Sequence, residues 1–324
     1  MHNTMPLTLR IDPWTPSYES AVQVEEDDAA VPTDVDPYVE TEAWEPLTPR
    51  ESARPPAVVF VDGVQRVETR VIGEDDGRMV YGAFASIAVG ATFARPGAAE
   101  CAVELPQRIL GLTGGASFPP VEVPCGRLLL RFEAHSTDIA GVNAVHEAVQ
   151  SARRAAETKL GEQLVDAGHP LVIVDGRLNL QPSRHSMTLG LVKTMHKQYL
   201  QPAQIAVLAQ LAPGTRTPLF RIPRDRAVYS WYLRLAAPRA IEHAWAGIVR
   251  LETLDSIGLE AAVELADVTA RHLPAFASSS IRDPRAPQNL YPIGALEDRL
   301  RRQLGDHELI RRHIEAHFQR VVAA

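Results

Sequence analysis

Two aspartates each follow a short run of apolar residues and precede a glycine. The runs are Val-Val-Phe-Val-Asp62-Gly and Leu-Val-Ile-Val-Asp175-Gly. A short apolar run bounded by turn residues is typical of a buried β-strand, so each pattern predicts a carboxylate at a strand end. If the two strands are neighbours, Asp62 and Asp175 can share a metal ion. One Asp-Gly pair alone is more often only a turn.

Paired carboxylates indicate the chemistry of hard divalent cations. Mg²⁺ and Mn²⁺ prefer carboxylate oxygens and water, and a pair of such ions can hold the attacking and leaving oxygens of a phosphodiester. This chemistry needs acids and no serine or cysteine nucleophile. The two cysteines, Cys101 and Cys125, fit no metal-ligand spacing.

A third acid is expected from the segment between the two aspartates, where residues 137–167 have helical periodicity. Glu157 is one candidate and Glu147 is the alternative. An ordinary ion pair on the helix surface is the competing interpretation of either glutamate.

The remaining pattern predicts a mixed α/β fold. The run at 57–62 should continue at 65–71 as a partner strand, and 82–94, 100–105 and 128–132 should complete an antiparallel sheet. Further strands are predicted at 171–175, 218–222, 227–235 and 248–252, and further helices at 188–212, 256–272, 294–304 and 307–322.

Charge is distributed unevenly along the 324 residues. Residues 12–51 contain twelve acidic residues and one basic residue, while the whole chain carries −7, so the remainder is net positive. We therefore predict an extended, acidic, proline-containing arm over residues 1–55 and a catalytic domain over residues 56–324. A basic body is compatible with DNA binding, although the arm could also serve only solubility.

The sequence predicts a cytoplasmic protein without a membrane segment. No stretch approaches the roughly 18 apolar residues of a span, and the first twenty residues lack the apolar centre of a signal peptide. Residues 111–115 are glycine-rich but lack the lysine and hydroxyl of a phosphate-binding loop, so ATP hydrolysis would have to come from a partner.

Seven short segments, in this order and spacing, resemble the NurA nuclease family over nearly everything after Pro55. They are Phe60-Val-Asp62-Gly, an arginine-rich helix with Glu157, Val-Ile-Val-Asp175-Gly-Arg-Leu178, Gly190-Leu-Val-Lys193-Thr, Pro218-Leu-Phe-Arg-Ile222, Trp231-Tyr-Leu-Arg-Leu235 and Asn289-Leu-Tyr-Pro-Ile293.

This resemblance implies a ribonuclease-H-like core, with a mixed sheet flanked by helices, after the acidic arm. It implies Mn²⁺- or Mg²⁺-dependent exo- and endonuclease cleavage of single- and double-stranded DNA by a homodimer. It further implies a HerA-type hexameric ATPase as partner, in DNA end processing or in defence against foreign DNA.

By position, the resemblance implies that Asp62, Glu157 and Asp175 are metal ligands. It implies a functional tyrosine in a late strand, for which Tyr232 fits better than Tyr229. Family members often carry a histidine shortly after the C-terminal Tyr-Pro, and this chain has none there. Either Glu297 or Asp298 could replace that histidine.

Several cations could bind DNA. Lys193 and Lys197, one turn apart on the predicted helix 188–212, could position phosphates or stabilise developing charge. The arginines that could contact the DNA backbone are Arg282, Arg285, Arg299, Arg301 and Arg302. A solvated charged surface is the alternative interpretation for all of these residues.

Two other functions fit the same sequence. The missing histidine motivates the first, a catalytically degenerate DNA-binding or assembly subunit that docks on a hexameric ATPase. The second is an RNA-directed nuclease on the same fold.

Overall fold

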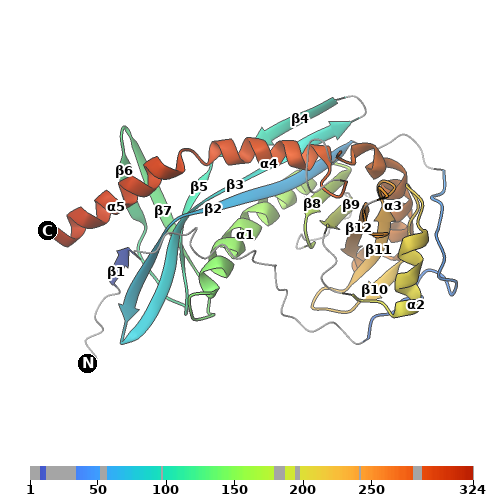
Figure 1. Ribbon diagram of the computed structural model, residues 1–324, viewed down its shortest axis with the longest axis horizontal. Helices are drawn as coiled ribbons and strands as arrows, with labels where there is room; N and C mark the ends of the chain where they lie inside the picture. Colours follow the sequence, from blue (N-terminus) through green and yellow to red (C-terminus); the bar gives the residue numbers. More distant parts are fainter. Residues whose placement is uncertain are drawn as a thin grey trace.

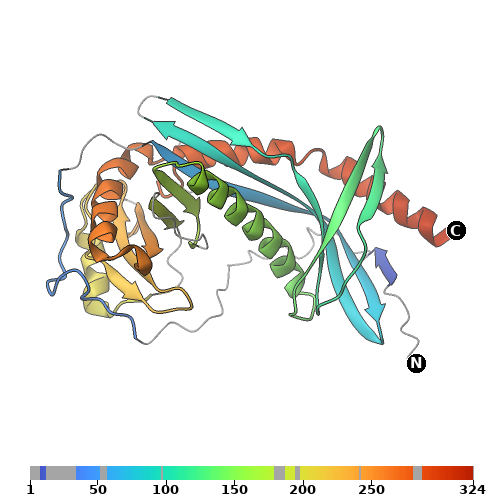
Figure 2. The ribbon, with the colours of Figure 1, turned by 180° about the vertical axis from the view of Figure 1, so that it is seen from behind.

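A single sheet runs through an elongated molecule and carries helices on both faces (Figures 1 and 2). The computed structural model describes residues 8–11, 34–51, 57–95, 98–178, 187–193, 198–240, 242–279 and 287–323. Among the helices in these ranges, none combines the length and apolarity needed to cross a membrane.

The centre of the sheet is a long antiparallel pair, β2 (Val58–Asp75) and β3 (Arg78–Arg95). Beyond β3 the order is β5 (Gln107–Leu112), β7 (Leu128–Ser136) and β6 (Val121–Cys125), and β4 (Ala98–Val103) also pairs with β3. Beyond β2 the order is β8 (Leu171–Asp175), β9 (Met187–Val192), β12 (Ile248–Leu254), β11 (Val228–Arg234) and β10 (Phe220–Ile222). The short β1 (Thr8–Ile11) pairs with the later part of β2.

The first half of β2 alternates between two cores because successive side chains point to opposite faces of a sheet. Val59 and Val61 pack with Leu164 of helix α1 (Ala144–Asp166). Val58 and Phe60 pack on the other face, where helices α3 (Leu259–His272) and α4 (Tyr291–Gln303) lie. The expected mixed sheet flanked by helices is therefore present, together with the short α2 (Pro202–Ile205) and the C-terminal α5 (His307–Ala323).

The strands around Asp62 and beyond β3 differ from the prediction. Residues 57–62 and 65–71 were expected to be two partner strands with a turn at Asp62-Gly63, but both lie in the single strand β2, which continues to Asp75 and pairs with β3. Only the pairing of β2 with β8 stops at Val61. The sequence pattern also does not predict β5 and β6, and β5 pairs with β7 in parallel.

The predicted helix 188–212 is wrong in its first part. Residues 187–192 form β9, which is hydrogen-bonded between β8 and β12. Leu189 and Leu191 are fully buried in the core on the α3 face. Burial between two strands decides the conformation here, whereas the spacing of the apolar residues also fits a helix. Lys193 consequently follows a strand and does not lie on a helix.

Candidate metal centre

Strand register brings Asp62 and Asp175 together. β2 and β8 run parallel, and their last paired residues are Val61 and Val174, so each aspartate is the next residue along its strand. Both carboxylates therefore lie at the same end of the segment over which β2 and β8 are paired. The two apolar runs are therefore neighbouring strands, which is the condition under which Asp62 and Asp175 can share a metal ion.

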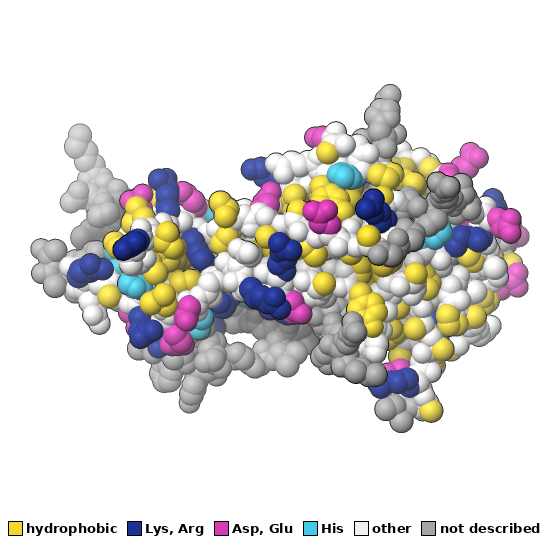
Figure 3. All heavy atoms as spheres, turned by 90° about the horizontal axis from the view of Figure 1, so that it is seen from above, with side chains coloured by type: hydrophobic (Ala, Val, Ile, Leu, Met, Phe, Trp, Pro, Cys, Tyr) yellow, Lys and Arg dark blue, Asp and Glu magenta, His cyan; other side chains and the backbone are white. Residues whose placement is uncertain are grey.

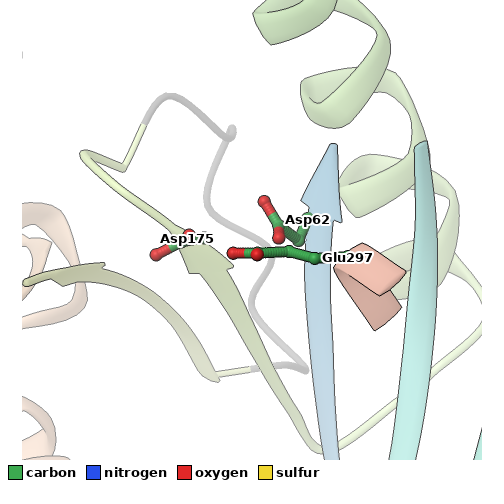
Figure 4. Close-up of side chains that lie close together, drawn as sticks. All are labelled: Asp62, Asp175 and Glu297. Atoms are coloured by element: carbon green, nitrogen blue, oxygen red, sulfur yellow. The ribbon is translucent and has the colours of Figure 1, made fainter. Parts of the chain in front are cut away.

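Glu297 of α4 completes an acidic cluster with the two aspartates. One carboxylate oxygen from each of the three residues lies within 4.8 Å of the others. Figure 4 shows Glu297 reaching across β2 towards Asp175, next to Asp62. Of the two acids proposed to replace the family histidine, Glu297 is the one in the cluster. Asp298 has a side chain that is 68% exposed and faces Arg301 at 3.8 Å.

The packing of α4 explains why Glu297 points inwards. Leu296, Leu300 and Leu304 are buried against the sheet beside Val64. The start of the helix is tied to β3, since the Thr92 hydroxyl donates to the Pro292 carbonyl oxygen at 3.1 Å. Glu297 follows Leu296 on this inner side and is itself buried, so its carboxylate projects into the protein.

Asp62 is the most deeply buried acid of the cluster, and only one of its two carboxylate oxygens has a hydrogen-bond partner among the described residues. Its Oδ1 accepts the Gly63 N–H at 2.8 Å, whereas its Oδ2 is buried and has no partner in the described part of the chain. Burial raises the pKa of Asp62 well above its usual value, and the nearby Asp175 carboxylate raises it further, while Lys193 lowers it. Glu157 and Glu297 add smaller upward contributions to this pKa.

The donor set fits a divalent cation. An unpartnered buried carboxylate oxygen is costly, and a group of buried like charges is costly as well, unless a cation compensates both. Three carboxylates supply only hard oxygen ligands, which match Mg²⁺ or Mn²⁺ and not a metal that prefers sulfur or imidazole. Asp62, Asp175 and Glu297 are thus the residues that would hold such an ion.

Lys193 lies against the acidic cluster. Its Nζ donates to Asp175 Oδ2 at 2.7 Å and to Asn289 Oδ1 at 2.7 Å. Asn289 is fully buried just before α4. The lysine is therefore held between a candidate ligand and a fixed amide. A cation in this position can stabilise negative charge on a phosphate that reaches the cluster.

Glu157 lies near the cluster but on the other face of β2. Its Oε1 is 2.5 Å from where a Cβ on Gly63 would lie, and Gly63 faces α1, whereas Asp62 faces α4. Arg153 Nη1 donates to this oxygen at 2.5 Å. Burial raises the pKa of Glu157 to about 7, even though Arg153 lowers it. Its role as a metal ligand stays a prediction.

Glu147, the alternative to Glu157, is three turns earlier on α1. Its side chain is 41% exposed and pairs with Arg154 at 3.3 Å. At 1.5 Å of rise per residue, it lies about 15 Å along the helix from Glu157. Of the two, only Glu157 contributes to the electrostatics of Asp62.

Tyr232 is a core residue in this structure. It lies on β11 opposite Arg250 of β12, stacks on Phe220 with ring centroids 5.6 Å apart, and is almost completely buried. Burial raises the pKa of its hydroxyl to about 12. It packs in the same core as Val59 and Val61, on the face of the sheet opposite to Asp62. The predicted functional role of Tyr232 is not supported by proximity to the three acids.

Part of the predicted DNA-binding set lies outside the described residues, namely Lys197, Arg282 and Arg285. Arg299, Arg301 and Arg302 are exposed on α4, the helix that carries Glu297. Figure 3 views the face along which α4 and α5 run, where Lys and Arg side chains recur on the surface. All three arginine side chains are exposed, and Arg301 also pairs with Glu297 of the acidic cluster at 3.2 Å.

Sequence reasoning assigned no role to Asn289 and left Glu297 as one of two alternatives. A signal for Asn289 exists, because it opens the segment Asn289-Leu-Tyr-Pro-Ile293 that resembles the nuclease family. Its contact with Lys193 joins residues 96 positions apart, so no local pattern predicts it. The same holds for Glu297, whose place depends on how α4 packs across β2.

No protein-family model matches the sequence, and no curated protein matches it either. A solved structure with a similar course of the chain is the crystal structure of the NurA nuclease from Sulfolobus solfataricus. The similarity covers 79% of this chain and 81% of that one, at 10% sequence identity and a TM-score of 0.44. Values this low assign neither a family nor an activity, so the chemistry of the site is argued from its own residues.

Proposed function

We propose that this chain is a divalent-metal-dependent nuclease that hydrolyses phosphodiester bonds in DNA. The observation that carries the proposal is the convergence of Asp62, Asp175 and Glu297 on one buried point. Lys193 beside them supports a phosphate substrate, because an anionic cluster alone would repel one. Exposed arginines on α4 support a polyanion that extends beyond the reacting phosphate.

The residues of the site have distinct roles in the proposed reaction. Asp62, Asp175 and Glu297 would hold the cation, which supplies charge stabilisation to the phosphate oxygens and lowers the pKa of a coordinated water. Lys193, oriented by Asn289, would stabilise the charge that develops on the phosphate. Asp62 and Glu297 are buried, and less polar surroundings strengthen electrostatic interactions.

Finer assignments extend this proposal. The antiparallel pair β3 and β2, continued by the parallel β8 and β9, supports a ribonuclease-H-like core. The resemblance of the sequence to NurA nucleases supports both single- and double-stranded DNA as substrates, a homodimer and a HerA-type hexameric ATPase as partner. A role in end processing or in defence follows from that partner.

The test is cleavage of labelled linear DNA, single- and double-stranded, with Mn²⁺, Mg²⁺ or a chelator. Asp62→Asn and Glu297→Gln should each lower the cleavage rate about 100-fold or more, since a metal centre contributes several kcal/mol to the barrier. Asp298→Asn is the matched control, because it changes the adjacent, exposed carboxyl of the same helix. Its cleavage rate should equal that of the unaltered chain.

Other outcomes would contradict the proposal. Cleavage that resists the chelator, or equal rates for Glu297→Gln and Asp298→Asn, would rule out this metal centre. Absence of cleavage together with stable binding to a hexameric ATPase would favour the degenerate assembly subunit. Stronger competition by RNA than by DNA would indicate the RNA-directed nuclease.

A further inference from the structure

Glu252 of β12 is a fully buried carboxylate with two arginine partners. Its Oε1 accepts from Arg224 Nη2 at 2.5 Å and its Oε2 accepts from Arg250 Nη1 at 2.6 Å. The Glu252 side chain is 0% exposed, and those of Arg250 and Arg224 are 5% and 18% exposed. Burying three charged groups is expensive, and this arrangement is stable only while each charge is paired.

The same carboxylate also holds the backbone that follows Asp175. Oε1 of Glu252 accepts the N–H of Leu178, three residues beyond Asp175, at 2.8 Å. The chain bends back directly after the aspartate, where Gly176 has a φ of 98° and donates its N–H to the Leu191 carbonyl oxygen at 2.8 Å. The two hydrogen bonds fix residues 176–178 from both ends.

The backbone of residues 176–178 packs directly on Gly190 of β9. A Cβ on Gly190 would lie 2.6 Å from Leu178 N and 2.7 Å from Gly176 O, so only glycine permits the approach. Gly190 is the register partner of both Val174 on β8 and Glu252 on β12. The bend after Asp175 therefore lies over β9 and reaches Glu252 on the next strand.

We propose that Glu252 is a positioning residue, which sets the place of the Asp175 carboxylate by holding residues 176–178 against β9. This inference rests on the proposed function only in that Asp175 is taken as a metal ligand. Glu252 itself does not belong to the acidic cluster, and it acts through the backbone. The flanking arginines keep the carboxylate charged and in one orientation.

The test measures Mn²⁺ affinity by isothermal titration calorimetry on the full-length chain, without any turnover. Glu252→Gln offers one acceptor oxygen where the carboxylate offers two, so Leu178 N–H and the arginines compete for it. The dissociation constant for Mn²⁺ should rise about tenfold or more, as is typical when a group that orients a ligand is lost.

Glu40→Gln is the matched control. Glu40 also accepts a backbone N–H, that of Leu219 at 2.7 Å, and also pairs with a buried arginine, Arg216 at 2.8 Å. It has no contact with residues 176–178 among the described interactions. Both variants lose a buried charge pair, but only Glu252→Gln should weaken Mn²⁺ binding at a temperature where thermal unfolding shows both to be folded.

Gly190→Ala keeps the inference testable if Glu252→Gln does not fold. The added methyl group pushes on Leu178 and Gly176 without changing any charge, and it should also raise the Mn²⁺ dissociation constant. Unchanged Mn²⁺ affinity in the folded variants would overturn the role of Glu252 while leaving the metal centre intact. Absence of Mn²⁺ binding by the unaltered chain would overturn the metal centre itself, and this inference with it.

Discussion

Protonation of Glu157 should be visible in the pH dependence of the stability of the protein. Burial raises its pKa from 4.5 to about 7, the Arg153 guanidinium opposes this rise, and Asp175 adds to it. The folded chain thus keeps a proton on Glu157 to a higher pH than the unfolded chain does. The resulting stabilisation is fully present below the unfolded pKa and is lost as the pH rises through the folded pKa.

We therefore predict that the free energy of unfolding of the metal-free protein falls between about pH 5 and pH 8. In Glu157→Gln this fall should be smaller by about 2 kcal/mol or more, because glutamine does not titrate and contributes equally at both pH values. Urea unfolding in the presence of a chelator measures the effect. An equal fall in both proteins would mean that Glu157 is ionised throughout, with Arg153 outweighing its burial.

At the scale of elements, α4 is attached to the sheet at its C-terminal end by a buried cluster around Glu68. A β-bulge between Val67 and Thr69 interrupts the register of β2 at this residue. Arg66 Nη2 donates to Glu68 Oε1 at 2.8 Å, and His307 Nδ1 lies 2.7 Å from Glu68 Oε2. Arg66 and Arg108 also both donate to the Leu304 carbonyl oxygen, at 3.2 and 3.0 Å.

Glu68→Gln should lower the free energy of unfolding by about 3 kcal/mol, because it removes a fully buried carboxylate and leaves the partly buried Arg66 and Arg108 without their counter-charge. Urea unfolding at neutral pH measures this change. Glu122→Gln serves as the comparison, since Glu122 pairs with Arg131 on the surface and both side chains are more than half exposed. If the two substitutions had the same small effect, the cluster would not be what holds α4 to the sheet.

The sequence predicts the strands and helices that carry the site better than it predicts how these elements pack together. The apolar runs before Asp62 and Asp175 predict two strands, and the parallel register confirms that these are neighbours. The strand β9 is not predicted, because its apolar spacing also fits a helix and only its place between β8 and β12 decides otherwise. Glu297 enters the site through the path of α4 across β2, which no short pattern specifies.

At the scale of the whole molecule, residues 34–51 are packed on the end of the sheet formed by β10 and β11. Asp36 bridges to Arg221 and Leu47 bridges to Arg216 through backbone hydrogen bonds. Arg216 has a side chain only 2% exposed and pairs with Glu40 and with Asp267, each at 2.8 Å. This part of the predicted arm is tied to the predicted catalytic domain by a buried ion pair.

Deletion of residues 1–51 should therefore lower the free energy of unfolding by about 3 kcal/mol or more, because Arg216 loses one of its two buried counter-charges. Glu40→Ala should reproduce a large part of this loss, whereas the exposed Glu42→Ala should not. Chemical unfolding of the three variants gives the comparison. A truncated protein as stable as the full chain would mean that residues 34–51 contribute nothing to the fold.

Asp62, Asp175 and Glu297 are proposed to bind one divalent cation. The most direct test is a crystal of the protein soaked in Mn²⁺, with anomalous scattering recorded at the manganese edge. We predict a peak about 2 to 2.5 Å from a carboxylate oxygen of each of the three residues. A peak elsewhere would contradict this metal centre. So would the absence of a peak when the same protein binds Mn²⁺ in solution.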